Sequence, residues 1–308
     1  MQNSSLAIET VGLSKRYGER LAVDNLNLQV ASGDVVGFLG PNGAGKTTTI
    51  AMLLGLVRPT AGRAALFGHD LATNPLAALA RVGAMIEAPA FYPYLSAHDN
   101  LRVLCKAGGI AEARIAPALA AVDLTGRARD KVRTFSQGMK QRLAIAAALL
   151  PDPALIMLDE PTNGLDPAGT AEIRALITNL AADGRTVFVS SHQLYEVEQV
   201  CRRVAILKQG RLIAEGQVDE LLRRGQMIRI RVEGDPNAAI ALLAGLPGVE
   251  RITLDGTTIL VDAPVTQAAA LNAHLARQGI AVAEIGAVHH SLEDFFLEVT
   301  GKPDKAKT

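Results

Sequence analysis

A glycine-rich segment, residues 40–47, has the composition and spacing of a loop that binds phosphate. Its sequence, GPNGAGKT, fits the pattern GxxxxGK[ST], in which glycines let backbone N–H groups point at phosphate oxygens. In such a loop Lys46 reaches the β- and γ-phosphates, and the hydroxyl of Thr47 is a ligand for Mg²⁺. The sequence therefore predicts a nucleotide site, and its candidate binding residues are Gly40, Pro41, Asn42, Gly43, Ala44, Gly45, Lys46, Thr47 and Thr48.

Two adjacent acids follow a second apolar run. Residues 155–158, LIML, are typical of a buried strand, and Asp159 and Glu160 come directly after them. Asp159 is placed to hold Mg²⁺, directly or through water. Glu160 is one residue further on and points the other way, so that it can polarise an attacking water. The buried strand before them indicates that the two acids take part in hydrolysis of the nucleotide and are not merely a solvated strand end.

A third segment makes the prediction specific. Residues 134–142, TFSQGMKQR, lie between the glycine-rich loop and the acidic pair, and they resemble the signature sequence of ABC transporter ATPases. P-loop kinases and GTPases have no such element. The resemblance implies that Ser136 and Gly138 contact ATP bound by a second ABC ATPase subunit. We therefore expect two copies of this chain to form a homodimer around ATP.

Three further positions match the same family. Tyr17 corresponds to the aromatic residue that stacks on adenine, and Asp166 corresponds to the residue that couples the two sites of the dimer. His192 corresponds to the switch histidine, which contacts the γ-phosphate and orients Glu160 and the attacking water. The resemblance covers residues 6 to 220.

One position departs from the common pattern of the family. Glu87 stands where most of these ATPases have glutamine between the two lobes. A carboxylate there can also ligate Mg²⁺ or hold the attacking water, but it cannot donate a hydrogen bond. The segment 86–95, IEAPAFYPYL, resembles the ATPases of bacitracin- and lantibiotic-type exporters, some of which carry glutamate. We therefore count Glu87 among both the catalytic and the metal-binding candidates.

Alternating strands and helices must position these residues. The apolar runs 35–39, 155–158, 187–189 and 204–207 predict strands, and 46–56 and 171–182 predict helices, so the core is an α/β fold with a largely parallel sheet. The resemblance assigns residues 6–222 to a P-loop NTPase of the ABC type, with a helical insert at about 88–134. Phe91, Tyr92 and Tyr94 in this insert are candidates for contact with a membrane subunit.

A second pattern begins near residue 226. Its order, βαββαβ followed by a helix, predicts a small C-terminal α/β domain of the ferredoxin-like type over residues 226–301. Within it, helices are expected at 235–243, 266–277 and from Ser291, and a strand at 280–285. Asp255 and Gly256 predict a two-residue hairpin turn. The polar tail, 302–308, is expected to be disordered.

Composition excludes several other classes of protein. The 308 residues include 31 Lys and Arg and 31 Asp and Glu, so the net charge is zero and a nucleic-acid partner is not expected. The most apolar stretch, 143–158, is interrupted by proline and aspartate at 151–153, so no membrane span is expected. Cys105 and Cys201 are far apart and are expected to be free thiols in the cytoplasm.

Together these features predict the ATP-binding subunit of an ABC transporter. The chain is expected to hydrolyse Mg-ATP and to drive export of a drug, antibiotic or peptide through a separate membrane permease, from the cytoplasmic face of the membrane. An importer ATPase and a non-transport ABC ATPase remain as alternatives. A translation-associated protein would have two cassettes in one chain, and a DNA-repair ATPase would carry a long coiled coil or zinc-binding cysteines. This sequence shows one cassette and neither of the other features, so both classes are disfavoured.

Overall fold

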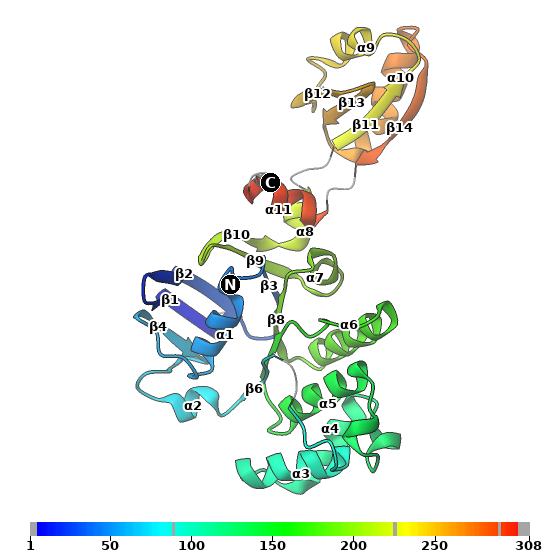
Figure 1. The fold of residues 1–308 in the computed structure, drawn as a ribbon. Coiled ribbons are helices and arrows are strands. Elements are labelled where there is room, and N and C mark those ends of the chain that lie inside the picture. Colours follow the sequence, from blue (N-terminus) through cyan, green and yellow to red (C-terminus); the bar gives the residue numbers. More distant parts are fainter. Residues whose placement is uncertain (1–4, 88–89, 224–226, 289–290, 301–308) are drawn as a thin grey trace, which may run out of the picture. The chain divides into compact units, whose positions relative to one another are not determined.

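In the computed structural model, residues 5–87, 90–223, 227–288 and 291–300 are described, and the chain divides between Gln217 and Val218 into two units (Figure 1). The sequence places the boundary later, between 222 and 226. The predicted tail, 302–308, and the predicted start of the helical insert, 88–89, lie outside the described residues.

A six-stranded sheet forms the centre of the first unit. Its order is β10-β9-β3-β8-β7-β6, and it is parallel except for the edge strand β10. Strands β3, β7 and β8 are buried at every position because both faces of the sheet are covered. The strands are β3 Val35–Leu39, β6 Val82–Met85, β7 Leu155–Asp159, β8 Thr186–Ser191, β9 Arg203–Lys208 and β10 Arg211–Gln217.

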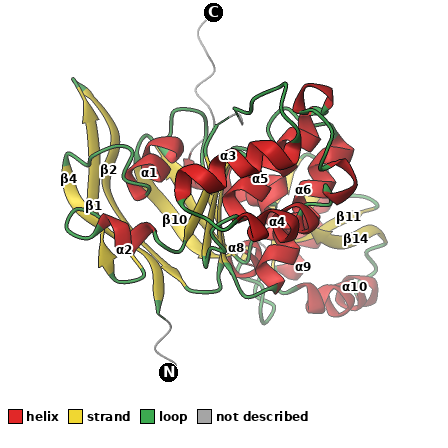
Figure 2. Cartoon of the chain, turned by 90° about the horizontal axis from the view of Figure 1, so that it is seen from below, coloured by secondary structure: helices red, strands yellow, loops and turns green. Residues whose placement is uncertain are grey.

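A four-stranded antiparallel sheet covers one face of this centre. Its order is β2-β1-β4-β5, and helix α1, Lys46–Leu53, packs between it and the parallel sheet, with contacts to β2, β4 and β7. Figure 2 shows β1, β2 and β4 on the side of α1 away from the larger helices. The strands are β1 Leu6–Tyr17, β2 Arg20–Ala31, β4 Ala61–Leu66 and β5 His69–Asp70, and the short helix α2, Pro75–Leu79, follows them.

Helices cover the other face of the parallel sheet. Helix α5 packs on β6 and β7, α6 packs on β8, and α7 packs on β8 and β3. The bounds are α5 Gln137–Leu149, α6 Pro167–Ala182 and α7 Leu194–Val200. Their inward faces are largely Ala, Leu and Ile, and α5 alone buries three alanines. This packing accounts for much of the apolar composition.

The helical insert packs on α5. It contains α3 Ala97–Gly108 and α4 Ile115–Ala121, with the 3₁₀ turns η1 Glu112–Arg114, η2 Thr125–Arg127 and η3 Val132–Thr134. The aromatic loop before α3 is held by a buried amide: Asn100 accepts a hydrogen bond from the backbone N–H of Tyr92 (2.8 Å) and donates one to its carbonyl (3.1 Å). The rings of Tyr92 and Tyr94 remain exposed.

The second unit has its own sheet and its own core. The sheet order, β12-β13-β11-β14 with every neighbouring pair antiparallel, is that of a split β-α-β arrangement. Helices α9 and α10 pack on one another, and their buried faces form one cluster with β11 and β13. The elements are α8 Val218–Arg223, β11 Met227–Val232, α9 Pro236–Leu243, β12 Arg251–Asp255, β13 Thr258–Asp262, η4 Val265–Gln267, α10 Ala268–Arg277, β14 Val282–Val288 and α11 Leu292–Thr300.

Several element bounds differ from those expected. Helix α6 begins at Pro167 and not at residue 171, because Asp166 caps it and proline is favoured at the first helical position. Helix α1 ends at Leu53 and not at Leu56, because Gly55 adopts a left-handed conformation (φ +69°) that closes the helix. Helix α10 begins at Ala268 after a 3₁₀ turn. Strand β14 begins at Val282 and not at residue 280, because the N–H of Ile280 donates to the carbonyl of Leu275 in the closing turn of α10 (3.0 Å).

Candidate functional site

The glycine-rich loop joins the buried strand β3 to helix α1. Gly45 is the N-cap of α1 at φ +107°, and a Cβ at this position would lie 2.5 Å from the carbonyl oxygen of Ala22, so only glycine fits. The loop leaves an open cavity above the start of α1, where backbone N–H groups are available for an anion. This cavity is lined by Arg20, Ala22, Asn42, Gly43, Gly45, Lys46, Thr47, Thr48 and Glu160.

Lys46 is buried beneath this cavity and already has partners. Its Nζ donates to the carbonyl of Gly40 (2.7 Å) and lies 3.1 Å from Oε1 of Glu160. A buried ammonium requires such neighbours, since an unpaired charge there would be costly. Phosphate oxygens entering the cavity would replace Glu160 as the anionic partner of Lys46.

Asp159 is held at the end of β7 by two hydroxyl groups. Thr47 donates to Oδ2 of Asp159 (2.8 Å), and Ser190 donates to Oδ1. The second contact follows from the sheet, because Asp159 and Ser190 are register partners in the parallel pair β7 and β8. The structure thus brings the oxygens of Thr47 and Asp159 together, although they are 112 positions apart in sequence.

Glu160 lies between two basic side chains. Its Oε2 is 2.8 Å from Nδ1 of His192, while its Oε1 contacts Lys46. The backbone of Glu160 is left-handed (φ +50°), which turns its side chain away from Asp159, and its N–H donates to Oγ of Ser190 (3.0 Å). A non-glycine residue in this region is uncommon, and such conformations are concentrated at functional sites.

Glu87 lies in a second cavity beside these groups. It follows β6 and is itself left-handed (φ +58°). The cavity that it lines also contains Thr47, Asp159 and Glu160, together with Gln137, Gln141, Asn163 and Gly164. Glu87 therefore faces the same space as the candidate metal ligands and the candidate base.

Ser136 and Gly138 of the signature segment line a third cavity. Ser136 is the N-cap of α5 and accepts from the N–H of Met139 (3.2 Å), and Asp166 is the N-cap of α6 and accepts from the N–H of Gly169 (2.8 Å). Ser136, Gly138 and Asp166 share this cavity with Arg142 and Glu172. None of the three lines the cavity of the phosphate loop, although their neighbours Gln137 and Gly164 also line the cavity that contains Glu87.

Tyr17 is the last residue of strand β1. Its ring is 48% exposed, and Nζ of Lys15 lies 4.9 Å from the ring centre. Its register partner across the turn is Arg20, the first residue of β2. The aromatic ring is available for stacking, as expected of a residue that contacts a base.

Sequence reasoning missed two residues of this site. Ser190, which orients Asp159 and binds the backbone of Glu160, could have been found from the strand 187–189 aligned beside 155–158. Arg20 lines the phosphate-loop cavity, but nothing in its local sequence indicates that role.

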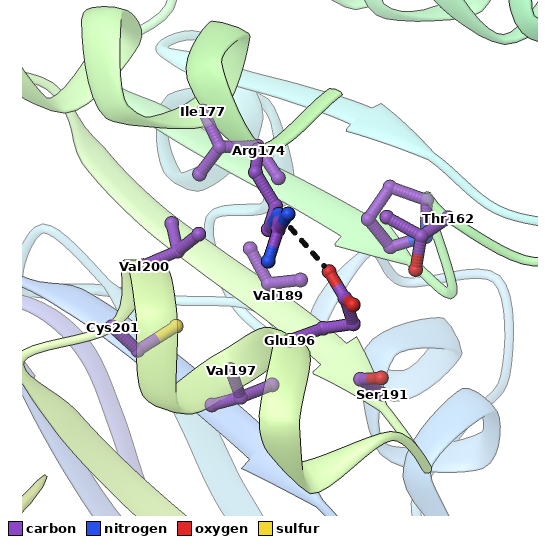
Figure 3. A pocket seen from close by; sticks show the side chains of 10 residues that line it. Thr162, Arg174, Ile177, Val189, Ser191, Glu196, Val197, Val200 and Cys201 are labelled. Carbon is purple, nitrogen blue, oxygen red and sulfur yellow. Dashed lines mark ion pairs between the residues drawn. The ribbon is translucent and has the colours of Figure 1, made fainter. Parts of the chain in front are cut away.

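A small pocket lies between β8, α6 and α7 (Figure 3). The figure shows Arg174 of α6 facing Glu196 of α7, and Nε of Arg174 is 3.3 Å from Oε2 of Glu196. That oxygen is buried and has no hydrogen bond among the described residues, so the contact is ionic. Cys201 closes the pocket, and burial raises the pKa of its thiol to about 12.

Comparison with known proteins connects this geometry to a family. A family model described as "ABC transporter" matches residues 23–163. The bacitracin transport ATP-binding protein BcrA of Bacillus licheniformis is 42% identical over 96% of this chain and 98% of its own length. The chain belongs to the ABC transporter ATP-binding proteins. The daunorubicin resistance ATP-binding protein DrrA3 of Streptomyces coeruleorubidus is 38% identical over 98% of both chains.

The structure of an ATP-binding cassette has the same fold. That cassette, a dimer in a post-hydrolysis state bound to ADP and Pi, matches with a TM-score of 0.61 at 28% identity, over 68% of this chain and 98% of its own. The first unit is therefore an ABC-type nucleotide-binding domain of the P-loop NTPase class, and the protein is an ATPase that binds ATP. No helix within the described ranges is both long and apolar enough to cross a membrane.

Proposed function

We propose that this ABC ATPase is the energy-supplying subunit of an exporter of antibiotics, drugs or peptides, working with a separate membrane permease at the cytoplasmic face of the membrane. The observation that carries the catalytic part is the position of Glu160, which lies 3.1 Å from Lys46 and 2.8 Å from His192. The export direction rests on relatives whose names describe bacitracin transport and daunorubicin resistance and which match along nearly the whole chain.

The proposed chemistry follows from the contacts around Glu160. When phosphates occupy the loop, Lys46 binds their β- and γ-oxygens, and the ion pair with Glu160 opens. The freed Oε1 can then accept a proton from the attacking water, while His192 holds Oε2 in place. General base assistance of this kind is worth about 10²–10⁴-fold in rate.

We also propose that Thr47 and Asp159 bind Mg²⁺, with Glu87 close enough to contribute. The donor set fits, because hydroxyl and carboxylate oxygens suit Mg²⁺, which keeps several waters and uses few protein ligands. Bound Mg²⁺ would neutralise charge on the β- and γ-phosphates.

The phosphate-loop cavity and the cavity lined by Ser136 and Gly138 are different cavities of one chain, which supports a dimer as the active form. Ser136 and Gly138 lie apart from Lys46 in one chain, and a second copy could supply them to complete the site. The matched cassette that holds ADP and Pi is itself dimeric. We propose that Tyr17 stacks on the adenine and that Asp166 links the two sites.

The exposed aromatic loop supports a permease partner. Tyr92 and Tyr94 are 62% and 74% exposed, while Asn100 fixes the backbone that carries them. Large exposed rings on a fixed backbone are typical of a binding surface. We propose that this loop receives a cytoplasmic segment of the permease.

Glu160→Gln tests the catalytic assignment. The amide cannot accept a proton, so we expect ATP hydrolysis to fall at least about a hundredfold, while Mg-ATP binding persists and holds the chain as a dimer. Phosphate release and light scattering after size-exclusion chromatography measure the two effects, with the exposed Glu112→Gln as a matched control. A variant that stays monomeric with saturating Mg-ATP and hydrolyses at the wild-type rate would show that the assignment is wrong.

The export assignment needs the membrane partner. Co-purification of the permease with this chain, followed by ATPase assays with bacitracin-like peptides and anthracyclines, should show stimulation by a transported compound. Association with a substrate-binding protein, and stimulation only when that protein is present, would favour the importer alternative.

A further inference from the structure

Arg20 has no role in the mechanism proposed above, although it lines the phosphate-loop cavity. It is the first residue of β2 and the register partner of Tyr17, the last residue of β1. Directly opposed residues of an antiparallel pair place their side chains on the same face of the sheet, about 5 Å apart. Arg20 and the ring proposed to stack on adenine are therefore neighbours on one face of the hairpin.

The side chain of Arg20 reaches from this hairpin to the phosphate loop. It lines the loop cavity together with Asn42, Gly43 and Lys46. A Cβ at Gly43 would lie 3.5 Å from Nη2 of Arg20, so the guanidinium lies next to the middle of the loop. A nucleotide whose base stacks on Tyr17 and whose phosphates enter the loop would pass this guanidinium.

The charges around the cavity distinguish Arg20 from Lys46. Lys46 is buried and held by the carbonyl of Gly40 and the carboxylate of Glu160. The side chain of Arg20 is exposed and makes no hydrogen bond or ion pair with any residue that the structure describes. The cavity therefore contains one positive charge that is already compensated and one that is not.

We infer that Arg20 binds the phosphate chain of the nucleotide from the outer side of the loop. A guanidinium suits this task, because its donors form a planar fork that matches phosphate oxygens. Arg20 would meet the incoming phosphates while Lys46 is still paired with Glu160. This inference rests on the proposed nucleotide site and adds a phosphate ligand to it.

Arg20→Gln in the full-length chain tests the inference. We expect the Kd for ATP to rise about tenfold or more, as for loss of a hydrogen bond to a charged group, with kcat at saturating Mg-ATP within about twofold of wild type. The Kd should also become less sensitive to added KCl, because an exposed cation has been removed. A fluorescent ATP analogue measures binding, and phosphate release measures turnover.

Two variants separate this role from a general effect of charge or folding. Arg20→Lys keeps the positive charge and should recover most of the affinity. Arg63→Gln removes an exposed arginine from β4, in the same antiparallel sheet but away from the cavity, and should bind ATP like wild type. Thermal unfolding shows whether each variant is folded.

The outcomes distinguish this inference from the proposed function. If wild type binds ATP and Arg20→Gln binds it equally well, or if Arg63→Gln weakens binding as much, Arg20 is not a phosphate ligand. If wild type itself binds no ATP, the proposed nucleotide site fails, and with it the premise of the inference.

Discussion

At the scale of single residues, Glu160 is shared between Lys46 and His192 and cannot serve as a base until one contact opens. The contact with Lys46 is the one that phosphate would break, because phosphate oxygens compete for the same ammonium. The contact with His192 can remain and orient the carboxylate. Nucleotide binding would thus by itself prepare the proposed base.

Glu87 can be tested at the same scale. We expect Glu87→Gln to keep ATP hydrolysis within roughly tenfold of wild type, or ~1.4 kcal/mol in the barrier. The amide oxygen can still contact a metal or a water, and its NH₂ group adds a donor that the carboxylate lacks. Steady-state phosphate release measures the effect, with Glu112→Gln as a control. A fall of several orders of magnitude would show that the carboxylate is indispensable.

At the scale of elements, helices α6 and α7 each begin at or just after a candidate site residue. Helix α6 begins at the cap Asp166, and α7 begins two residues after His192. Helix α7 also lies tightly on β3, since a Cβ at Gly37 would collide with the side chain of Val197. The ion pair of Arg174 with Glu196 joins the two helices (Figure 3).

This ion pair should contribute to stability. The side chains are 26% and 15% exposed, so we expect Arg174→Met or Glu196→Gln to lower the free energy of unfolding by about 1–2 kcal/mol, between the values for surface and buried pairs. The double variant should lose less free energy of unfolding than the two single variants lose together, as measured by urea denaturation. Arg127 and Asp130, a more exposed pair, serve as the control and should show changes below about 0.5 kcal/mol. Strictly additive losses at Arg174 and Glu196 would mean that the pair itself contributes nothing.

At the scale of the whole molecule, the two units have separate hydrophobic cores. The core around Phe38 and Phe188 belongs to the first unit, and the core around Ile228 and Ile230 belongs to the second. Every candidate site residue lies in the first unit. We propose that the second unit contributes dimer contacts or regulation and no catalytic group.

A shortened chain tests this division. We expect residues 1–217 to fold and to bind ATP with a Kd within about threefold of the full-length value, because no core residue of the nucleotide-binding unit is removed. Thermal unfolding and binding of a fluorescent ATP analogue provide the measurements. Loss of ATP binding by a folded 1–217 chain would show that the second unit contributes to the site.

Local sequence was sufficient to predict most helices and strands and to identify the family. The loop 40–47, the strand ending at Asp159 and the capped helix after Ser136 each depend on neighbours in sequence, through backbone conformation, burial and a local hydrogen bond. The end of α1 and the start of β14 differ from the prediction by a few residues, because the apolar pattern continues into helix-closing turns.

The chemical groups of the site can be listed from the amino-acid sequence alone: the phosphate loop, the acids Asp159 and Glu160, the switch histidine and the signature. How these groups combine depends on the fold, because contacts between distant strands are set by sheet register and by left-handed turns. Register places Ser190 against Asp159, and a left-handed turn directs Glu160 toward Lys46 and His192. Strand pairing likewise places Arg20 beside Tyr17 at the phosphate loop, where no local motif indicates a binding residue.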